Sequence, residues 1–235
     1  MISGLQKMTL LDYPGKVACT VFLQGCNFRC PFCHNSDLLG KDGPDTIPAE
    51  TLLAFLKKRV GLLDAVCITG GEPTLQKDLL ELIRQIKALG YLVKLDTNGS
   101  RPAVLKALAE EGLIDYVAMD IKNSSSEYGK TVGVPNMDLT GVEESIRYLL
   151  EEHVDYEFRT TVADELHAEQ DMEEMGRWLC GLIPGRKPRR HYIQPYVDRD
   201  SVLTQGLHTP EKAKLLAMAE KLAPYADLVE IRGMD

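Results

Sequence analysis

The sequence lacks the features of several large classes of protein. It has no excess of basic residues: 27 Lys and Arg stand against 35 Asp and Glu, a net charge of -8, so no cationic surface for nucleic acid or anionic membrane is expected. No stretch is apolar for long enough to cross a bilayer, and the first residues lack the basic start and apolar core of a signal peptide. We therefore expect a cytoplasmic protein that binds neither nucleic acid nor membrane.

Internal repeats and low-complexity segments are also absent from the 235 residues. Charged residues make up 26% and hydrophobic residues 44%, close to globular averages, so the composition does not indicate disorder. The length suits one α/β domain. We predict a single domain over 1–235, with its core at about 17–200 and a C-terminal helix and strand within 210–232.

Cysteine is scarce, with six in the chain, but three of them lie within eight residues, at Cys26, Cys30 and Cys33. In a reducing compartment such a cluster points to metal binding or catalysis rather than to a disulfide framework. The three cysteines follow a short apolar run that ends at Gln24 and Gly25. We expect this run to be a strand that delivers a cysteine loop from its C-terminal end.

Apolar, β-branched runs and helical spacings alternate along the chain. The runs predict strands at 17–23, 65–69, 91–95, 116–119, 155–162 and 191–194, and a last strand at 228–231. A Gly, Pro and Asp-rich link at 40–44 precedes a helix that begins near 48–50 and carries Leu52, Leu53, Leu56 and Val60 on one face. Further helices are expected around 79–86, 104–108, 142–150, 172–179 and 210–222. The order predicts a parallel sheet covered by helices.

An open doubly wound sheet and a full or partial (β/α) barrel both fit this order. Polar residues help to choose between them, because they follow the ends of different strands. They are Cys26 and the segments 70–72, 96–98, 120–122 and 194–196. In a barrel all of these meet on one face. We therefore favour a partial barrel of about six strands.

Three thiolates suit either zinc or an iron-sulfur cluster, and they leave one coordination position unassigned. A structural zinc site needs a fourth ligand. His34 directly follows Cys33, so both side chains could hardly reach one tetrahedral ion. Cys19 and Cys67 lie in predicted strands and Cys180 ends a predicted helix, so these three are expected to be ordinary packing residues.

The spacing Cys26-x-x-x-Cys30-x-x-Cys33, with Phe32 before the last cysteine and Gly70 to Pro73 after the second strand, resembles the radical S-adenosylmethionine enzymes. The resemblance implies a (β/α)6 barrel of the radical SAM type. It also implies a 4Fe-4S cluster held by the three cysteines, whose open fourth iron binds the amine and carboxylate of S-adenosylmethionine. One electron from the reduced cluster then produces a 5′-deoxyadenosyl radical.

The same resemblance assigns further cofactor-binding residues. Gly70, Gly71 and Glu72 match the segment that binds the methionine ammonium, and paired glycines allow backbone to approach a ligand closely. Phe32 matches a residue that packs against adenine, and His34, beside it in the loop, is a further candidate.

Within the superfamily, the segments Asp12 to Gly15, Cys33 to Asn35, Asp96 to Gly99 and Asp120 to Lys122 resemble the activating enzymes of glycyl radical proteins. The similarity is strongest to the long form of the anaerobic ribonucleoside-triphosphate reductase activating protein. It implies that a glycyl radical enzyme is the partner and loses a hydrogen atom from the Cα of a glycine. A low-potential electron donor such as flavodoxin or ferredoxin is also implied.

The pyruvate formate-lyase activating enzyme, which the chain also resembles, implies a monovalent cation held by Asp96, Thr97 and Asp120 beside the S-adenosylmethionine carboxylate. Lys122 would contact the cofactor. The match is imperfect, because that enzyme has methionine where Ala118 stands, and its histidine contact aligns near Val197.

Two alternatives remain open. The chain could be a radical enzyme acting on a small molecule, or a non-catalytic metal-binding module. Asp12 and the loop 123–128 are candidates for partner contact by position. Arg159 and Thr160 are expected to line the cavity or to make structural hydrogen bonds, and His167 is expected at the surface. The basic run 186–190 is expected to be a solvated loop or a dock for an acidic partner, and His191 receives no role.

Overall fold

One mixed sheet of eight strands organises the molecule, and its strands follow each other in sequence order from β1 to β8. The structure, a computed structural model, describes residues 1–40 and 46–233. Strands β2 to β8 each lie parallel to their neighbours in this series, whereas β1 runs antiparallel to β2. The strands are β1 (Ile2–Thr9), β2 (Ala18–Leu23), β3 (Ala65–Gly70), β4 (Leu92–Thr97), β5 (Tyr116–Asp120), β6 (Asp155–Val162), β7 (His191–Pro195) and β8 (Val229–Ile231).

This strand order decides between the two predicted architectures. A doubly wound sheet reverses its strand order at a switch point, whereas here each strand lies beside the next one in the sequence. Sequential winding is the order of a (β/α) barrel. Since β1 and β8 form the two edges of the sheet, the barrel is partial, as predicted.

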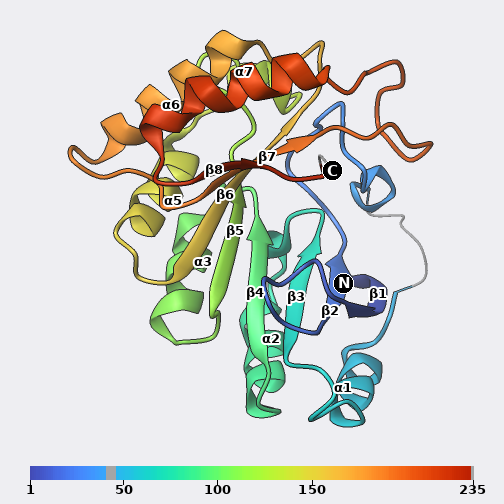
Figure 1. The fold of residues 1–235 in the computed structure, drawn as a ribbon. Coiled ribbons are helices and arrows are strands. Elements are labelled where there is room, and N and C mark those ends of the chain that lie inside the picture. Colours follow the sequence, from blue (N-terminus) through green and yellow to red (C-terminus); the bar gives the residue numbers. More distant parts are fainter. Residues whose placement is uncertain (41–45, 234–235) are drawn as a thin grey trace.

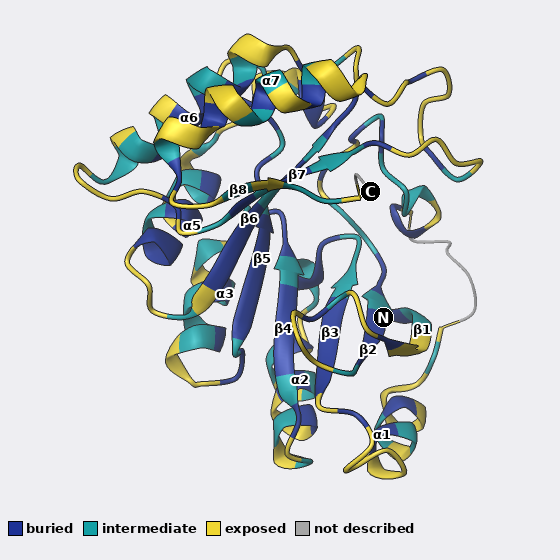
Figure 2. Cartoon of the chain, in the orientation of Figure 1, coloured by how far each residue is buried: buried dark blue, intermediate teal, exposed yellow. Residues whose placement is uncertain are grey.

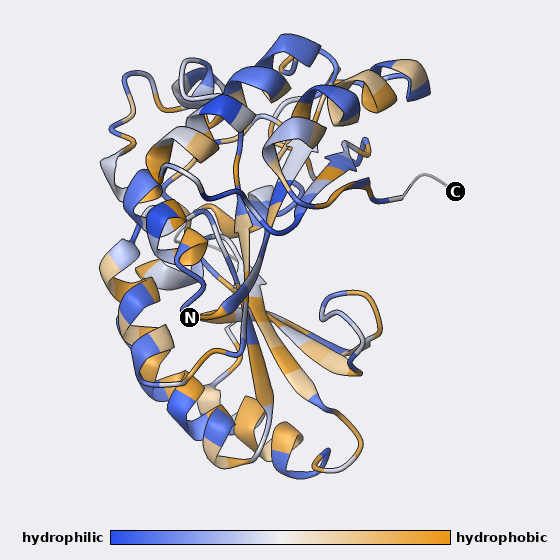
Figure 3. Cartoon of the chain, turned by 60° about the vertical axis from the view of Figure 1, so that its left-hand side comes forward, coloured by the Kyte–Doolittle hydropathy of each residue, from blue (hydrophilic) through white to orange (hydrophobic). Residues whose placement is uncertain are grey.

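Helices cover the outer face of the curved sheet, as Figure 3 shows from the side. They are α1 (Ala49–Lys57), α2 (Leu79–Ala88), α3 (Pro102–Glu110), α4 (Tyr128–Thr131), α5 (Thr140–Leu150), α6 (Glu169–Leu182) and α7 (Lys212–Leu222), with short 3-10 turns at Ser36–Leu38, Pro73–Leu75 and Ala223–Tyr225. In Figure 1, α6 and α7 lie together above β7 and β8. Strands β4 to β6 are buried along most of their length, and the outward helix faces are exposed (Figure 2). Among the described residues, none of the helices is long and apolar enough to cross a membrane.

Several boundaries differ from the prediction. The edge strand β1 was not predicted, because its sequence does not alternate regularly and its pairing with β2 carries two register irregularities. Helix α1 ends at Lys57, so Val60 lies beyond it and is 57% exposed rather than on its buried face. The short helix α4 was also missed. The link predicted at 40–44 lies, apart from Gly40, outside the described residues.

The two faces of the strands have different chemistry. Side chains alternate along a strand, so Leu95, Met119 and Thr160 pack on the helix side and are buried. Their neighbours Asp96, Asp120 and Arg159 line a pocket on the inner side. The inner face of the barrel is therefore polar at the carboxyl ends of the strands, while the outer face forms the apolar core.

The opposite end of the barrel interior is closed by the loop that follows β1, which crosses in front of β3 and β4 in Figure 1. Tyr13 of this loop packs on Tyr116, with ring centroids 5.8 Å apart, and joins Ala18, Ala65 and Cys67 in a small apolar cluster. This apolar cluster fills the amino end of the barrel interior.

A buried ion pair fixes the last strand to the barrel interior. Glu157 on β6 is 1% exposed and accepts two hydrogen bonds from Arg232, which follows β8, at 2.8 and 2.7 Å. Tyr116 donates a third at 2.8 Å. Burial disfavours the charge of Glu157, but the hydrogen bonds from Arg232 outweigh it and lower the pKa of the carboxyl.

We predict that Arg232→Met lowers the free energy of unfolding by about 2 kcal/mol, because the carboxylate of Glu157 would remain buried without its cation. The loss is smaller than for a fully buried pair since the Arg232 side chain is 35% exposed. Urea denaturation measures it. The matched control is Arg84→Met, which breaks the exposed pair with Glu111 and should cost much less stability, because water screens an exposed pair. Equal losses in the two variants would contradict the prediction.

Candidate active site

The three clustered cysteines line one pocket at the carboxyl end of β2. Cys26, Cys30 and Cys33 all border it, and Cys30 is the most buried at 7% exposed. The loop is fixed to the barrel by backbone hydrogen bonds, including Arg29 N–H to the Val132 carbonyl at 2.8 Å. The predicted cysteine loop therefore lies where the sequence placed it.

The chemistry of these thiols fits a metal cluster. Burial raises the pKa of all three, and that of Cys30 to about 12, so binding of a metal cluster would displace the thiol protons. Cys26 Sγ accepts a hydrogen bond from Phe28 N–H at 3.4 Å. Within the described residues, no three His, Cys, Asp or Glu side chains converge on a single metal ion. A cluster of several irons does not require the three thiolates to meet at one point, because each thiolate binds a different iron.

The other cysteines lie elsewhere, as expected. Cys19 on β2 and Cys67 on β3 are fully buried among apolar neighbours. Cys180 lies on α6 and donates to the Tyr225 carbonyl at 3.4 Å. Among the described residues that line the pocket, three are cysteines and none of these others is included.

The paired glycines seat the cysteine loop. A Cβ at Gly71 would lie 2.2 Å from the Gly25 carbonyl oxygen, and one at Gly70 would lie 2.3 Å from the Leu23 backbone. Gly70 also has φ +120°, which side chains rarely tolerate. Glu72 N–H donates to the Gly25 carbonyl at 2.7 Å. The backbone at Gly70 and Gly71 does make close contacts, as the sequence suggested. In the structure these contacts are to Leu23 and Gly25, the backbone that leads into the cysteine loop.

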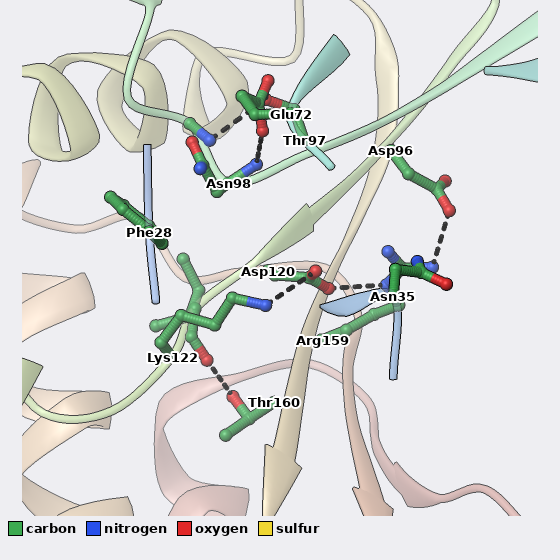
Figure 4. Close-up of polar contacts among 12 residues, drawn as sticks. Phe28, Asn35, Glu72, Asp96, Thr97, Asn98, Asp120, Lys122, Arg159 and Thr160 are labelled. Atoms are coloured by element: carbon green, nitrogen blue, oxygen red, sulfur yellow. Dashed lines mark hydrogen bonds and ion pairs between the residues drawn. The ribbon is translucent and has the colours of Figure 1, made fainter. Parts of the chain in front are cut away.

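The Glu72 side chain does not reach the pocket. It is fully buried, and its carboxylate accepts hydrogen bonds from Thr97 Oγ1 and Asn98 N–H, each at 2.7 Å, and from both donors of Thr74 (Figure 4). Burial raises the pKa of Glu72 despite these donors. Glu72 therefore ties the end of β3 to the end of β4, and only Gly70 and Gly71 of the predicted ammonium-binding segment border the pocket.

A chain of ion pairs crosses the inner face from β4 to β6. Arg159 on β6 donates to Asp120 on β5 at 3.0 Å and to Asp96 on β4 at 3.3 Å. Lys122 donates to Asp120 at 3.0 Å, and Lys94 donates to Asp96 at 2.5 Å. Figure 4 shows Arg159 between the two carboxylates. Arg159 thus lines the cavity, which the sequence alone left open.

These ion pairs shift the pKa values of the residues that form them. Burial disfavours the charge of Asp120, but Arg159 and Lys122 outweigh it and lower the pKa of the carboxyl to about 2. Burial likewise opposes the charge of Lys122, yet Asp120 raises the pKa of the ammonium. The pKa of Asp96 is also lowered, against burial, by Arg159 and Lys94. Asp96, Asp120 and Lys122 are therefore charged at neutral pH.

The predicted cation site does not fit these residues. Both oxygens of Asp96 and both oxygens of Asp120 already accept a hydrogen bond from a cationic nitrogen. The hydroxyl of Thr97 donates to Glu72 on the other side of the strand. The structure therefore brings Asp96 and Asp120 together, as predicted, but around the side chain of Arg159.

The aromatic residues of the loop are held by partners that the sequence did not reveal. Phe32 is 4% exposed, with Lys122 Nζ 5.9 Å from its ring centroid. His34 stacks on Tyr196 and makes a 2.7 Å contact from Nε2 to the Val197 carbonyl. Both residues line the pocket, so both remain candidates for cofactor binding.

Asn35 and Asn98 are among the pocket residues that were not predicted as site residues. Asn35 donates from Nδ2 to the Gly70 carbonyl at 3.0 Å, and Asn98 donates to Asn27 Oδ1 at 2.9 Å. Each links the cysteine loop to the end of another strand. Their positions directly after Cys33–His34 and Asp96–Thr97 are the signal that could have found them.

The expectation for His167 is corrected, and the roles left open for Thr160 and His191 are decided. His167 is buried at 2% exposed, not at the surface, and contacts the Lys122 carbonyl through Nε2 at 2.9 Å. Thr160 points away from the cavity, donates to the Ile121 carbonyl at 2.8 Å and lies 2.8 Å from His191 Nε2. His191 is fully buried, and burial lowers its pKa to about 3, so it is a neutral core residue.

A partial barrel with three cysteines at its carboxyl end defines a class of enzyme, and comparison identifies it. The model of the Radical SAM superfamily matches residues 20–179. The chain therefore belongs to the radical SAM superfamily, whose cofactors are a 4Fe-4S cluster and S-adenosylmethionine.

Individual relatives narrow the likeness. A Methanocaldococcus jannaschii protein, whose name proposes a glycyl-radical enzyme activating enzyme, is 32% identical over 246 residues, covering 100% of this chain and 97% of the relative. The pyruvate formate-lyase-activating enzyme of Clostridium pasteurianum is 31% identical over 136 residues, 56% of each protein. The crystal structure of Streptococcus suis SuiB bound to precursor peptide SuiA has a TM-score of 0.69 at 17% identity, covering 91% of this chain and 48% of SuiB. This last match supports the fold alone.

We predict that Gly71→Ala displaces the cysteine loop. The added Cβ would overlap the Gly25 carbonyl, so the free energy of unfolding should fall by about 1–3 kcal/mol and less iron should bind after reconstitution. Iron analysis and urea denaturation measure the two effects. The matched control is Gly181→Ala on α6, where an added Cβ meets nothing within 4 Å and stability should change by less than about 1 kcal/mol. Unchanged iron content in Gly71→Ala would contradict the prediction.

A second prediction concerns acid stability. A carboxyl whose pKa is lowered on folding stabilises the protein above its ordinary pKa, and this contribution is lost as pH falls toward the folded value, about 2 for Asp120. Between pH 5 and pH 3 the wild type should therefore lose about 1 kcal/mol more unfolding free energy than Asp120→Asn. Urea denaturation at the two pH values tests this. Parallel losses would show that Asp120 is not held ionised by its partners.

Proposed function

We propose that this protein activates a glycyl radical enzyme by cleaving S-adenosylmethionine reductively at a 4Fe-4S cluster. One observation carries the proposal: the three thiols of Cys26, Cys30 and Cys33 share a single pocket with the charged ends of β4, β5 and β6. Soft ligands for a cluster and charged groups for a zwitterionic cosubstrate thus meet at one place. The similarity to an activating enzyme over the full chain supports the same function.

The residues of the pocket divide into three roles. Cys26, Cys30 and Cys33 would each hold one iron, and the cluster, when bound, supplies the electron that cleaves the sulfonium of S-adenosylmethionine. The backbone of Gly70 and Gly71 would approach the methionine ammonium. Lys122, which is paired with Asp120, would lie beside the methionine carboxylate. Phe32 and His34 would lie beside the adenine.

The hydrogen transfer itself needs no acid or base. The Cα–H bond of the partner glycine breaks homolytically, its hydrogen atom joins the C5′ of the adenosyl group to give 5′-deoxyadenosine, and the unpaired electron stays on the glycine Cα. The protein contributes by holding the two carbons close together and by excluding other hydrogen donors. The plugged lower end of the barrel, closed by Tyr13 and Tyr116, serves that exclusion.

The partner we propose is the anaerobic ribonucleoside-triphosphate reductase, with flavodoxin or ferredoxin as the electron donor. The full-length match to a proposed activating enzyme supports a glycyl radical partner. Asp12, a contact candidate by its position in the sequence, accepts a hydrogen bond from Thr20 on β2 and belongs to the loop that closes the end of the barrel opposite the cysteines. In the loop 123–128, Asn123, Ser124 and Tyr128 are buried, so only 125–127 are accessible to a partner.

We predict that the reconstituted, reduced protein forms 5′-deoxyadenosine from S-adenosylmethionine under anaerobic conditions, and that Cys30→Ser abolishes it. Removing one thiolate leaves one iron of the cluster without its protein ligand. Chromatography of the nucleoside product measures the reaction. Cys180→Ser is the matched control, because Cys180 lies on α6 and a serine preserves its hydrogen bond to Tyr225; this variant should retain activity.

The substrate is tested by adding the anaerobic reductase and recording the electron paramagnetic resonance spectrum. A glycyl radical signal that requires both S-adenosylmethionine and the intact cysteines supports the proposal. Deoxyadenosine without a radical on the reductase would favour a different partner or a small-molecule substrate. A wild-type protein without cluster absorption would favour a non-catalytic metal-binding module.

A further inference from the structure

Lys94 is a buried lysine inside the barrel that the proposed chemistry does not use. It lies on β4 two residues before Asp96, so both side chains point to the inner face. Its side chain is only 2% exposed, and its ammonium donates to Asp96 Oδ1 at 2.5 Å. Lysine is rarely buried, because removing its charge from water is costly even when an anionic partner such as Asp96 is present. The position of Lys94 therefore needs an explanation.

The pair occupies the coordination space of a cation. Asp96 and Asp120 are the two carboxylates that the family resemblance assigns to a monovalent ion. In this chain the four carboxylate oxygens accept hydrogen bonds from Lys94, Arg159 and Lys122. A metal ion at this place would have to share these oxygens with the cationic nitrogens, whose positive charges repel it at short range.

The net charge of the site also disfavours a bound metal ion. Three cationic side chains face two carboxylates, which leaves one surplus positive charge in a poorly solvated site. One more cation would double that surplus at short range, which is costly where water screens little. The single surplus charge, by contrast, matches the one negative charge of the methionine carboxylate.

The neighbours leave room for the lysine. Ala118 on β5 pairs in register with Asp96, and it is the position where the related activating enzyme carries methionine. Cys67 on β3 pairs with Lys94 itself. Both side chains are small, so the long stem of Lys94 fits the middle of the barrel, and its ammonium reaches Asp96.

We propose that Lys94 is a built-in replacement for the monovalent cation, and that it positions Asp96 for S-adenosylmethionine binding without a metal ion. The proposal rests on the proposed function in that it concerns the same cosubstrate site. It makes the protein independent of sodium and potassium, in contrast to the cation-dependent arrangement that the family resemblance implies.

The test compares S-adenosylmethionine binding in three salts. The cluster-loaded protein is titrated anaerobically by calorimetry in potassium, sodium or tetramethylammonium chloride at one ionic strength; tetramethylammonium is too large to bind between the carboxylates. The wild-type Kd should agree within about twofold in all three salts. Lys94→Met, which keeps the stem and removes the charge, should bind at least about tenfold more weakly in tetramethylammonium and recover in potassium or sodium.

The matched control is Lys106→Met, which removes a lysine charge from an exposed pair with Glu144 and should remain indifferent to the salt. A wild type that needs sodium or potassium would overturn the proposal. So would a Lys94→Met variant whose binding does not depend on the salt, because the vacated carboxylate should then accept an ion.

A second measurement separates this proposal from the proposed function. The thermal unfolding midpoint is recorded in the same three salts without S-adenosylmethionine. Potassium or sodium should raise the midpoint of Lys94→Met but not of the wild type or Lys106→Met. If no variant binds S-adenosylmethionine in any salt, the proposed function fails, whereas the salt dependence of the midpoint still decides whether Lys94 fills a cation site. A midpoint of Lys94→Met that is equal in all three salts would overturn the proposal.

Discussion

The pairing of buried charges inside the barrel is the constraint on which the site depends. Asp96, Asp120 and Arg159 come from three neighbouring strands, and each would be costly to bury alone. Their side chains neutralise one another only when the strands keep their register, such as Asp120 beside Arg159. The ion pairs therefore couple the order of the strands to the shape of the pocket, and they place a fixed set of charges at its floor.

A second contact determines where the cysteines lie. Gly71 and Gly25 meet backbone to backbone, at a distance that no side chain permits. The hydrogen bond from Glu72 N–H to the Gly25 carbonyl holds this contact, and the buried Glu72 carboxylate extends it to Asn98 on the next strand. Residues that look like ligand contacts in the sequence thus also serve as the support of the cysteine loop. Loss of this support would change cluster binding without removing a single cysteine.

The ion pairs and the glycine contact have different roles in the proposed reaction. The glycine contact holds the thiols at the mouth of the barrel, where a cluster can meet a cosubstrate. The ion pairs form a rigid, positively charged surface beside it, which suits a carboxylate. Neither part needs to move for the hydrogen transfer, since that step depends on the distance between two carbons and on the exclusion of other donors. The contact between Tyr13 and Tyr116 closes the far end of the interior.

Much of this organisation follows from the chain itself. The apolar runs determined the seven parallel strands within a few residues, because buried strands need continuous hydrophobic sequence, and the cysteine spacing determined the metal-binding loop. The edge strand β1 could not be predicted, since an irregular, half-exposed pairing leaves no alternation. The direction in which a single side chain points could not be predicted either. His167 was expected at the surface and is buried, and Glu72 was expected to contact a ligand but points into the protein.

The sequence determined which polar residues end each strand, because that depends on local order alone. Only the tertiary structure decided which charges meet, and it placed Lys94 and Arg159 on the carboxylates of Asp96 and Asp120, because ion pairs between strands depend on register and on the alternation of side chains across the sheet.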